Sequence, residues 1–200
     1  MNLELEKNAT EAKRQRILDG AMAVVLRYGF QRATMEDVAK EAGISRPALY
    51  LLFKNKAEIY RALAESVMGE ALRRAEAALS ATGGIEERIF AAVKTGILDP
   101  TELLMATAHG AELLDMKHNM AAEVIEDWRA KKAAMIADAL ETSGAAEAKG
   151  LSGAALADIL LDGMEGLKMR AKTGAGREAG ARVLVRLVAS FETPLRGSSG

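Results

Sequence analysis

The sequence contains no cysteine, which excludes disulfides, thiolate metal sites and cysteine nucleophiles. It has only three prolines, and aromatic residues make up 4% of the chain. No apolar run approaches the roughly 18 residues of a membrane-spanning helix, and residues 1–10 are polar and mixed in charge, unlike a secretory signal. We therefore expect a cytoplasmic protein without a membrane partner. Half of the residues are hydrophobic, and the helix-favouring composition predicts an all-α fold.

Sequence motifs of common enzyme classes are also missing. There is no nucleophile elbow, phosphate-binding loop or dinucleotide fingerprint. Between the two histidines, His109 and His118, the only acidic residues are Glu112 and Asp115, and no Glu-x-x-His motif occurs. We therefore expect no catalytic residues, no metal site and no cofactor.

The segment from Thr34 to Lys56 contains two short helix patterns separated by a tight turn. Thr34 is a good N-cap for the first helix, and Asp37 stands three residues later, where a reciprocal capping partner belongs. Gly43 supplies the left-handed residue that commonly follows the end of a helix. This first half of the segment therefore predicts a helix over residues 34–42.

The second half of the segment predicts a helix with two different faces. Ser45 is its N-cap, and Pro47 lies in the first turn, where a missing N–H costs nothing. Leu49 and Phe53 are four residues apart and therefore share one face of the helix. This layout is typical of a helix-turn-helix whose second helix enters the major groove of DNA.

At these residues the sequence resembles the tetracycline-repressor (TetR) family of transcriptional regulators. The resemblance runs from Arg14 to Leu63 and is carried by the stretch GISRPALYLLFKNK, which follows a long helix pattern. It implies a three-helix DNA-binding head followed by a helical bundle that binds an effector and dimerises, with about nine helices in all. We assign the head to residues 10–56, the effector-binding and dimerisation domain to residues 57–192, and a flexible tail to residues 193–200.

The predicted DNA contacts lie on and around the second helix of the motif. Arg46, at the start of that helix, can pair with two acceptors of guanine, unless it only touches phosphate. Three apolar neighbours can contact thymine methyl groups, and five hydroxyl or ammonium side chains can bind phosphate. The resemblance implies phosphate binding at Tyr50 and Lys56, although Tyr50 can also be a half-buried core residue. The apolar set is Pro47, Ala48 and Leu51, and the phosphate set is Thr34, Ser45, Tyr50, Lys54 and Lys56.

Charge and two departures from the family pattern bear on these contacts. Residues 1–56 hold ten Lys/Arg and seven Asp/Glu, a net +3, whereas residues 57–200 hold seventeen and twenty-one, a net −4. From charge alone these basic residues are solvated helix surface, and only their coincidence with the motif suggests phosphate contacts. Leu51 and Leu52 stand where the family often has aromatic or histidine residues, and we expect Leu52 to turn into the core. Glu36 would repel phosphate unless it accepts a hydrogen bond from a cytosine amine.

Glycine and proline positions divide the rest of the chain into further helices. We expect breaks at residues 82–84, at Gly96, at residues 144–150 and at residues 174–176. The expected helices cover residues 10–28, 34–42, 45–54, 55–79, 85–95, 100–115, 119–142, 152–172 and 177–191.

The last two of these helices are predicted to form a dimer interface. The helix over residues 152–172 carries two apolar stripes, so it can pack inward and against a second copy at once. The resemblance also implies a four-helix interface between two copies. The alternative is that both stripes lie in the core of a single chain. The predicted interface residues are Leu156, Leu160, Gly163, Leu167, Leu184, Leu187, Val188 and Phe191.

The middle of the chain is predicted to hold an effector pocket. Seven of the ten methionines lie beyond residue 56, and flexible thioethers suit an adaptable apolar cavity as well as ordinary core filling. His109 can orient a ligand or be a structural histidine, and Trp128 can equally be an interface or surface residue. The predicted lining consists of Phe90, Leu104, His109, Met116, Trp128 and Met164.

The sequence thus predicts a DNA-binding transcriptional regulator. We expect a repressor that binds a palindromic operator in double-stranded DNA as a homodimer and is released by a small, largely apolar effector. The alternative is a helical-bundle ligand carrier or enzyme that retains the head without regulatory DNA binding. Turnover without sequence-specific DNA binding would favour the alternative.

Overall fold

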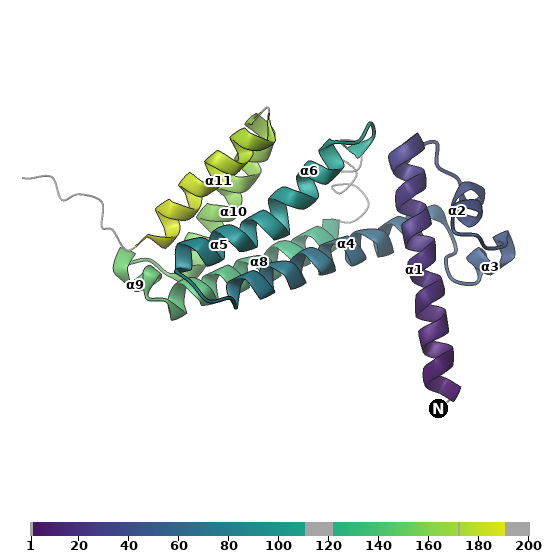
Figure 1. Ribbon diagram of the computed structural model, residues 1–200, viewed down its shortest axis with the longest axis horizontal. Helices are drawn as coiled ribbons and strands as arrows, with labels where there is room; N and C mark the ends of the chain where they lie inside the picture. Colours follow the sequence, from purple (N-terminus) through teal and green to yellow (C-terminus); the bar gives the residue numbers. More distant parts are fainter. Residues whose placement is uncertain (1, 111–121, 172, 191–200) are drawn as a thin grey trace, which may run out of the picture. The chain divides into compact units, whose positions relative to one another are not determined.

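The computed structural model describes residues 2–110, 122–171 and 173–190, and its regular elements over these residues are all helices (Figure 1). The all-α fold predicted from composition is therefore confirmed. The elements are α1 (Asn2–Tyr28), α2 (Met35–Glu41), α3 (Arg46–Tyr50), α4 (Lys56–Leu79), α5 (Ile85–Val93), the π-helical η1 (Lys94–Leu98), α6 (Asp99–Met105), α8 (Ala122–Thr142), α9 (Ala145–Lys149), α10 (Gly153–Arg170) and α11 (Gly174–Ala189).

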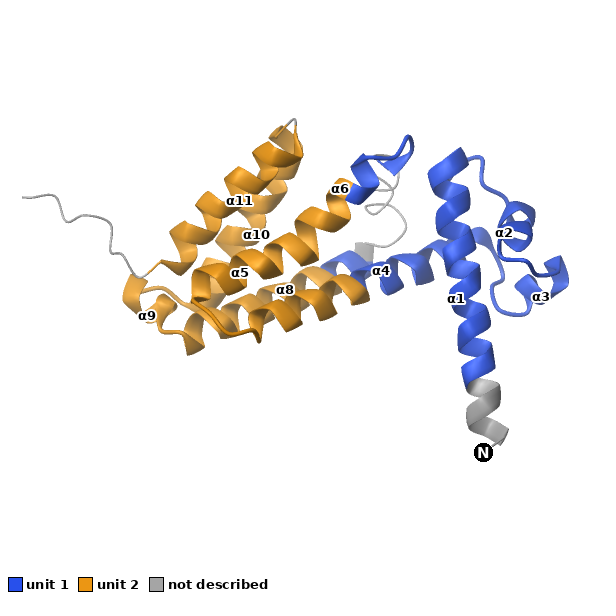
Figure 2. Ribbon diagram, viewed as in Figure 1, with its two compact units in different colours: residues 1–68, 103–126 blue, residues 69–102, 127–200 orange. Residues whose placement is uncertain are grey.

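The chain forms two compact units (Figure 2). Unit 1 consists of residues 1–68 and 103–126, and unit 2 consists of residues 69–102 and 127–200. Helix α4 begins in unit 1 and continues into unit 2. Over the described ranges, no helix combines the length and the apolar character needed to cross a membrane. The predicted tail, residues 193–200, lies outside the described residues.

Unit 1 is held together by a core between α1, α2, α3 and the start of α4. Ile17 on α1, Val38 on α2, Leu49 on α3 and Ile59 on α4 are all fully buried in it. Gly20 allows α2 to end close to α1, because a Cβ there would lie 3.0 Å from the backbone nitrogen of Ala42. The long first helix thus serves as the support on which the two short helices are packed.

Unit 2 has its own core, formed by α5, α8, α10, α11 and the C-terminal end of α4. Ile89, Leu140, Leu160 and Val185 are fully buried there. Helices α10 and α11 pack side by side at short distance (Figure 1). A Cβ added at Gly163 of α10 would lie 2.7 Å from Leu184 Cδ1 on α11, so a small residue is needed at this crossing.

An ion pair between a buried arginine and a partly exposed glutamate joins α6 to α11 within unit 2. The Arg177 side chain is buried, and its Nε donates to Glu102 Oε1 at 2.5 Å while Nη1 donates to the carbonyl oxygen of Ala171 at 2.8 Å. The hydrogen bond from Arg177 lowers the pKa of the Glu102 carboxyl below its ordinary value. The start of α11 is therefore fastened to α6 by a charge-assisted bond.

Three expected breaks between helices are wrong. Gly96 does not end a helix but lies in η1, where a Cβ would come within 3.1 Å of Ala75 Cβ, so this glycine permits close packing on α4. The expected linker over residues 144–150 contains α9, which lies between two left-handed residues, Gly144 and Gly150. Helix α11 begins at Gly174, because the side chain of Thr173 caps it and the expected break at residues 174–176 is its first turn.

The predicted dimer residues are placed in two groups. Leu156, Leu160 and Val188 are buried in the core of unit 2, and Leu167 and Leu184 are partly buried against it. This departs from the predicted interface, because the stripes face their own chain. Only Leu187 of the predicted set is strongly exposed, at 64%, and Phe191 lies outside the described residues. Ile159 and Val183, which the prediction omitted, are also more than half exposed.

Candidate nucleic-acid interface

The first helix of the motif is closed at both ends as its sequence predicts. The Thr34 hydroxyl accepts from the Asp37 backbone N–H at 3.1 Å, and the Asp37 carboxylate accepts from the Thr34 backbone N–H at 3.0 Å. Gly43 follows α2 with a positive φ of 64°, and the next residue, Ile44, donates its backbone N–H to the carbonyl of Ala39 at 3.0 Å. These bonds fix the turn that sets the direction of α3.

Helix α3 has one fully buried face and one exposed face. Leu49 is completely buried in the unit 1 core, and Phe53, just after the helix, is 2% exposed. On the other face Leu51 is 84% exposed and Tyr50 is 43% exposed. Because an exposed leucine gains nothing from water, an outward apolar and aromatic surface of this kind is typical of a contact surface.

Arg46 lies at the start of α3 with most of its side chain in solvent. Its guanidinium is 3.9 Å from the carboxylate of Glu36 on α2 and 5.8 Å from the ring centre of Tyr50. An exposed ion pair at this distance contributes little to stability, so a stronger partner can replace Glu36. Pro47 is exposed and Ala48 is half-buried, so the exposed α3 surface combines a guanidinium with small apolar groups.

The side chains predicted to bind phosphate differ in how many hydrogen bonds they already make within the chain. Lys54 is exposed, and Ser45 is exposed while its hydroxyl oxygen accepts from the Ala48 backbone N–H. The Thr34 hydroxyl is already committed, because it also donates to the Asp37 carboxylate at 2.6 Å. Leu52 is half-buried against the unit 1 core, in the direction expected from its position.

Lys56 makes contacts within unit 1 that its sequence position did not predict. Its Nζ donates to the carbonyl oxygens of Phe30 at 2.8 Å, Ala33 at 3.0 Å and Gln31 at 3.4 Å, and it lies 4.3 Å from the ring centre of Phe30. An ammonium has three N–H donors, and here they point at the loop between α1 and α2. These hydrogen bonds connect the start of α4 to that loop within unit 1, and the phosphate contact of Lys56 stays a prediction.

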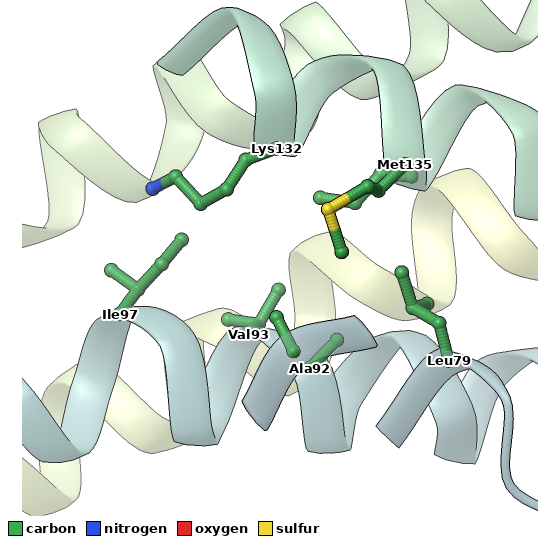
Figure 3. Close-up of a pocket in the computed structure, with 8 residues that line it drawn as sticks. Leu79, Ala92, Val93, Ile97, Lys132 and Met135 are labelled. Atoms are coloured by element: carbon green, nitrogen blue, oxygen red, sulfur yellow. The ribbon is translucent and has the colours of Figure 1, made fainter. Parts of the chain in front are cut away.

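The predicted effector-pocket residues are divided between the two units. Leu104 and His109 belong to unit 1, whereas Phe90, Trp128 and Met164 belong to unit 2. Met164 is buried in the unit 2 core, and Phe90 is covered by the guanidinium of Arg182 at 3.8 Å. Met116 lies outside the described residues. The apolar cavity of unit 2 is lined by other side chains, including Leu79, Val93, Lys132 and Met135 (Figure 3).

Comparison with known proteins agrees with the geometry of the head. Residues 17–63 match the family described as bacterial regulatory proteins of the tetR family. The matched segment begins within α1, contains α2 and α3, and ends within α4. Residues 17–63 therefore resemble the DNA-binding head of TetR-family regulators.

The relatives found by sequence are matched over only part of their length. The HTH-type transcriptional regulator YfiR of Bacillus subtilis (strain 168) is 35% identical over 74 residues, which cover 37% of this chain and 36% of that protein. This chain thus spans less than half the length of the relatives that it matches.

Solved protein structures match nearly the whole chain. Escherichia coli NemR in its reduced form has a TM-score of 0.68, 18% identity and coverage of 92% of this chain and 100% of NemR. SmeT, the repressor of the Stenotrophomonas maltophilia multidrug efflux pump SmeDEF, has a TM-score of 0.62 and 18% identity, with coverage of 91% and 96%. At this identity the likeness establishes a shared fold.

Sequence reasoning did not predict the contacts that Lys56 and Lys132 make within the chain. Lys56 has no sequence signal that distinguishes a phosphate contact from a bond to a carbonyl 26 residues earlier. Lys132 does have one, because it interrupts the apolar series Trp128, Met135 and Ile136 on one side of α8. A single charge within an apolar helical stripe is a usable signal of a buried charged group.

Proposed function

We propose that this protein is a transcriptional repressor that binds a palindromic operator as a homodimer and is released by a small effector. The observation that carries the DNA-binding part is the division of α3, with Leu49 fully buried and Arg46, Tyr50 and Leu51 turned outward. A helix fixed from behind in this way can enter the major groove without rearranging its support. Operator binding would place the protein in the bacterial cytoplasm.

Each outward group of α3 supplies a different kind of recognition. Arg46 can give paired hydrogen bonds to guanine, and Leu51 can contact a thymine methyl group. The Tyr50 and Ser45 hydroxyls and the Lys54 ammonium, all exposed, can bind phosphate and set the register of the helix. The net positive charge of residues 1–56 also supports binding of this segment to the negatively charged DNA backbone.

Dimerisation is supported by exposed apolar side chains on α10 and α11. Ile159, Val183 and Leu187 are 53%, 60% and 64% exposed, and we call them the outer apolar face. Val183 and Leu187 are four residues apart and share one side of α11. A second copy would cover these side chains, and two heads about 34–36 Å apart would then match successive major grooves.

Repression and release are supported by family resemblance and by the course of α4. SmeT, with the same fold, is the repressor of an efflux pump. Helix α4 begins at Lys56 in unit 1 and reaches the cavity of unit 2 with Ala75 and Leu79. A ligand that prefers one position of α4 can shift the DNA-binding equilibrium only by its difference in affinity between the two states.

The DNA-binding proposal can be tested by selecting binding sequences from a random double-stranded pool. We expect a palindromic site to be enriched, and Arg46→Ala to relax the preference for one base pair per half-site at a cost of about 1–3 kcal/mol. Arg73→Ala, at a similarly exposed arginine in unit 2, is the matched control and should leave the selected site unchanged. Absence of any enriched sequence would refute the proposed function.

A further inference from the structure

An acidic side chain lies beside the arginine at the start of α3. Glu36, in the first turn of α2, has its Oε2 3.9 Å from Nη1 of Arg46, the first residue of α3. The two side chains are 78% and 60% exposed. Because 3.9 Å is beyond hydrogen-bond distance, the carboxylate and the guanidinium form a loose ion pair, and each keeps its hydrogen-bonding capacity for another partner.

This closeness limits which part of DNA suits Arg46. A group that accepts a hydrogen bond from the Arg46 guanidinium also comes near the Glu36 carboxylate. A phosphate in that place is attracted by the guanidinium but repelled by the carboxylate. A base edge that presents an acceptor beside a donor satisfies both side chains. The ion pair therefore favours a base edge over the DNA backbone as the partner of Arg46.

A G·C base pair presents this pattern in the major groove. Guanine offers two acceptors, N7 and O6, and the N4 amine of cytosine offers a donor beside them. The O6 and N4 atoms are joined by a Watson–Crick hydrogen bond, so they lie about 2.9 Å apart. The 3.9 Å between Arg46 Nη1 and Glu36 Oε2 is close enough to this spacing for the two groups to approach neighbouring atoms of one base pair.

We infer that Glu36 and Arg46 together read a single G·C base pair in each half of the operator. Arg46 would donate to O6 and N7 of guanine on one strand, while Glu36 would accept from the N4 amine of cytosine on the other. The inference rests on the proposed function and names part of the sequence that the head recognises. It makes Glu36 a specificity-determining residue, beyond the stabilisation that an acidic residue gives to the first turn of a helix.

The Glu36 carboxylate also disfavours the other base pairs at the same place. In an A·T or a C·G pair an acceptor oxygen, thymine O4 or guanine O6, would face the carboxylate and be repelled by it. In a T·A pair the adenine amine could face Glu36, but Arg46 would meet only one acceptor, thymine O4, instead of two. The G·C orientation alone satisfies both side chains in full.

Selection of binding sequences from a random double-stranded pool tests this reading. We expect Arg46→Ala and Glu36→Ala to relax the same G·C pair, each lowering its preference over other base pairs about tenfold. Glu36→Ala should also bind unrelated DNA more tightly, because a negative charge near the backbone is lost. If Glu36→Ala gains affinity for all sequences alike and keeps the preference, or relaxes a different base pair, the inference is overturned.

Glu41→Ala is the matched control for Glu36→Ala. Glu41 is also an acidic residue of α2 in an ion pair with an arginine, since its carboxylate lies 3.1 Å from Arg27 on α1. We expect Glu41→Ala to keep the G·C preference of the unaltered protein. Loss of that preference in Glu41→Ala as well would show a general effect of charge on α2 and overturn the role given to Glu36.

A modified operator tests the cytosine contact on the unaltered protein. N4-methylcytosine keeps the hydrogen of the Watson–Crick bond but carries a methyl group in place of the hydrogen that faces the major groove. We expect it, at the selected G·C pair, to weaken binding of the unaltered protein about tenfold and to affect Glu36→Ala much less. Equal losses in both proteins would overturn the inference. So would equal binding of both operators by the unaltered protein, even if the variant does not fold.

These outcomes separate the inference from the proposed function. If a palindrome is enriched without a G·C pair that depends on Glu36, the regulator proposal stands and the reading by Glu36 and Arg46 fails. If no sequence is enriched at all, both fail, because the reading requires an operator.

Discussion

At the scale of single residues, Lys56, the first residue of α4, connects that helix to the loop that joins α1 to α2. Its ammonium donates to three backbone carbonyls of that loop. A hydrogen bond from a charged group contributes about 1.5–3 kcal/mol, so Lys56→Met should lower the free energy of unfolding by about that amount. Urea unfolding followed by circular dichroism would measure the loss.

Lys54, two residues earlier and exposed, is the matched control for Lys56. Lys54→Met should leave stability nearly unchanged but reduce the slope of log affinity against log salt by about 0.9, the value for one lost phosphate contact. Lys56→Met should leave this slope unchanged. A reversed pattern, with a stable Lys56→Met that loses salt dependence, would restore the phosphate role predicted from the sequence.

The Tyr60 hydroxyl is another residue-scale feature of the unit 1 core. It is buried and has no hydrogen-bond partner among the described residues, while its ring packs edge-on against Phe30. Tyr60→Phe keeps the ring and removes the unsatisfied group, so we expect the free energy of unfolding to rise by about 1 kcal/mol. A fall in stability would mean that the hydroxyl has a partner, such as a bound water.

The pH dependence of stability gives an independent test at Tyr60. Burial raises the pKa of the Tyr60 hydroxyl well above its ordinary value, and the nearby Asp37 carboxylate raises it further. The unfolded chain therefore loses this proton first, at about pH 10, and stability should fall as pH rises above that value. In Tyr60→Phe the fall above pH 10 should be shallower, which unfolding at pH 9, 10 and 11 would show.

At the scale of elements, the close approach of α10 and α11 depends on Gly163. An added Cβ at Gly163 would lie 2.7 Å from Leu184 Cδ1, whereas at Gly166 the nearest atom would be Arg170 Nη2 at 3.5 Å. Gly166→Ala should therefore gain about 0.5–1 kcal/mol from helix propensity. Gly163→Ala should lose about 1 kcal/mol or more, because Leu184 must move.

Denaturant midpoints of these two glycine variants, at one protein concentration, would give the comparison. Gly166 lies on the same helix, so both substitutions carry the same gain in helix propensity. Equal stabilisation of both variants would show that α10 and α11 are not in close contact at Gly163.

Local patterns predicted the helices and caps of this chain better than they predicted the partners of each helix. Thr34 and Ser45 cap their helices as expected, because capping needs only neighbours three residues away. Gly96 was read as a break, but its role depends on contact with Ala75 some twenty residues earlier. An apolar stripe likewise indicates that a helix face is covered, but it does not show which element covers it. For this reason Leu156 and Leu160 were assigned to a second copy, whereas residues of their own chain cover them.

The predicted pocket shows the same limit more strongly. Phe90, Trp128 and Met164 were chosen for their chemistry, but a cavity is defined by where several helices leave space. Lys132 was overlooked because most lysines lie in solvent. The head was easier to predict, because its surface follows from one short helix whose buried residues, Leu49 and Phe53, are spaced by one turn.

At the scale of the whole molecule, operator affinity should depend on two heads acting together through the outer apolar face. Leu187→Glu adds a charge to that face, where a second copy would bury it, so we expect dissociation into monomers on light scattering after size exclusion. Because one head makes few contacts, affinity for a palindromic site should fall by about tenfold or more, while a single half-site is bound as before. Leu103→Glu is the control: Leu103 is 72% exposed on α6 and is not part of the outer apolar face, so its variant should remain dimeric. A dimeric Leu187→Glu with full operator affinity would move the contact between copies to another surface, since a buried glutamate could not be tolerated at the proposed one.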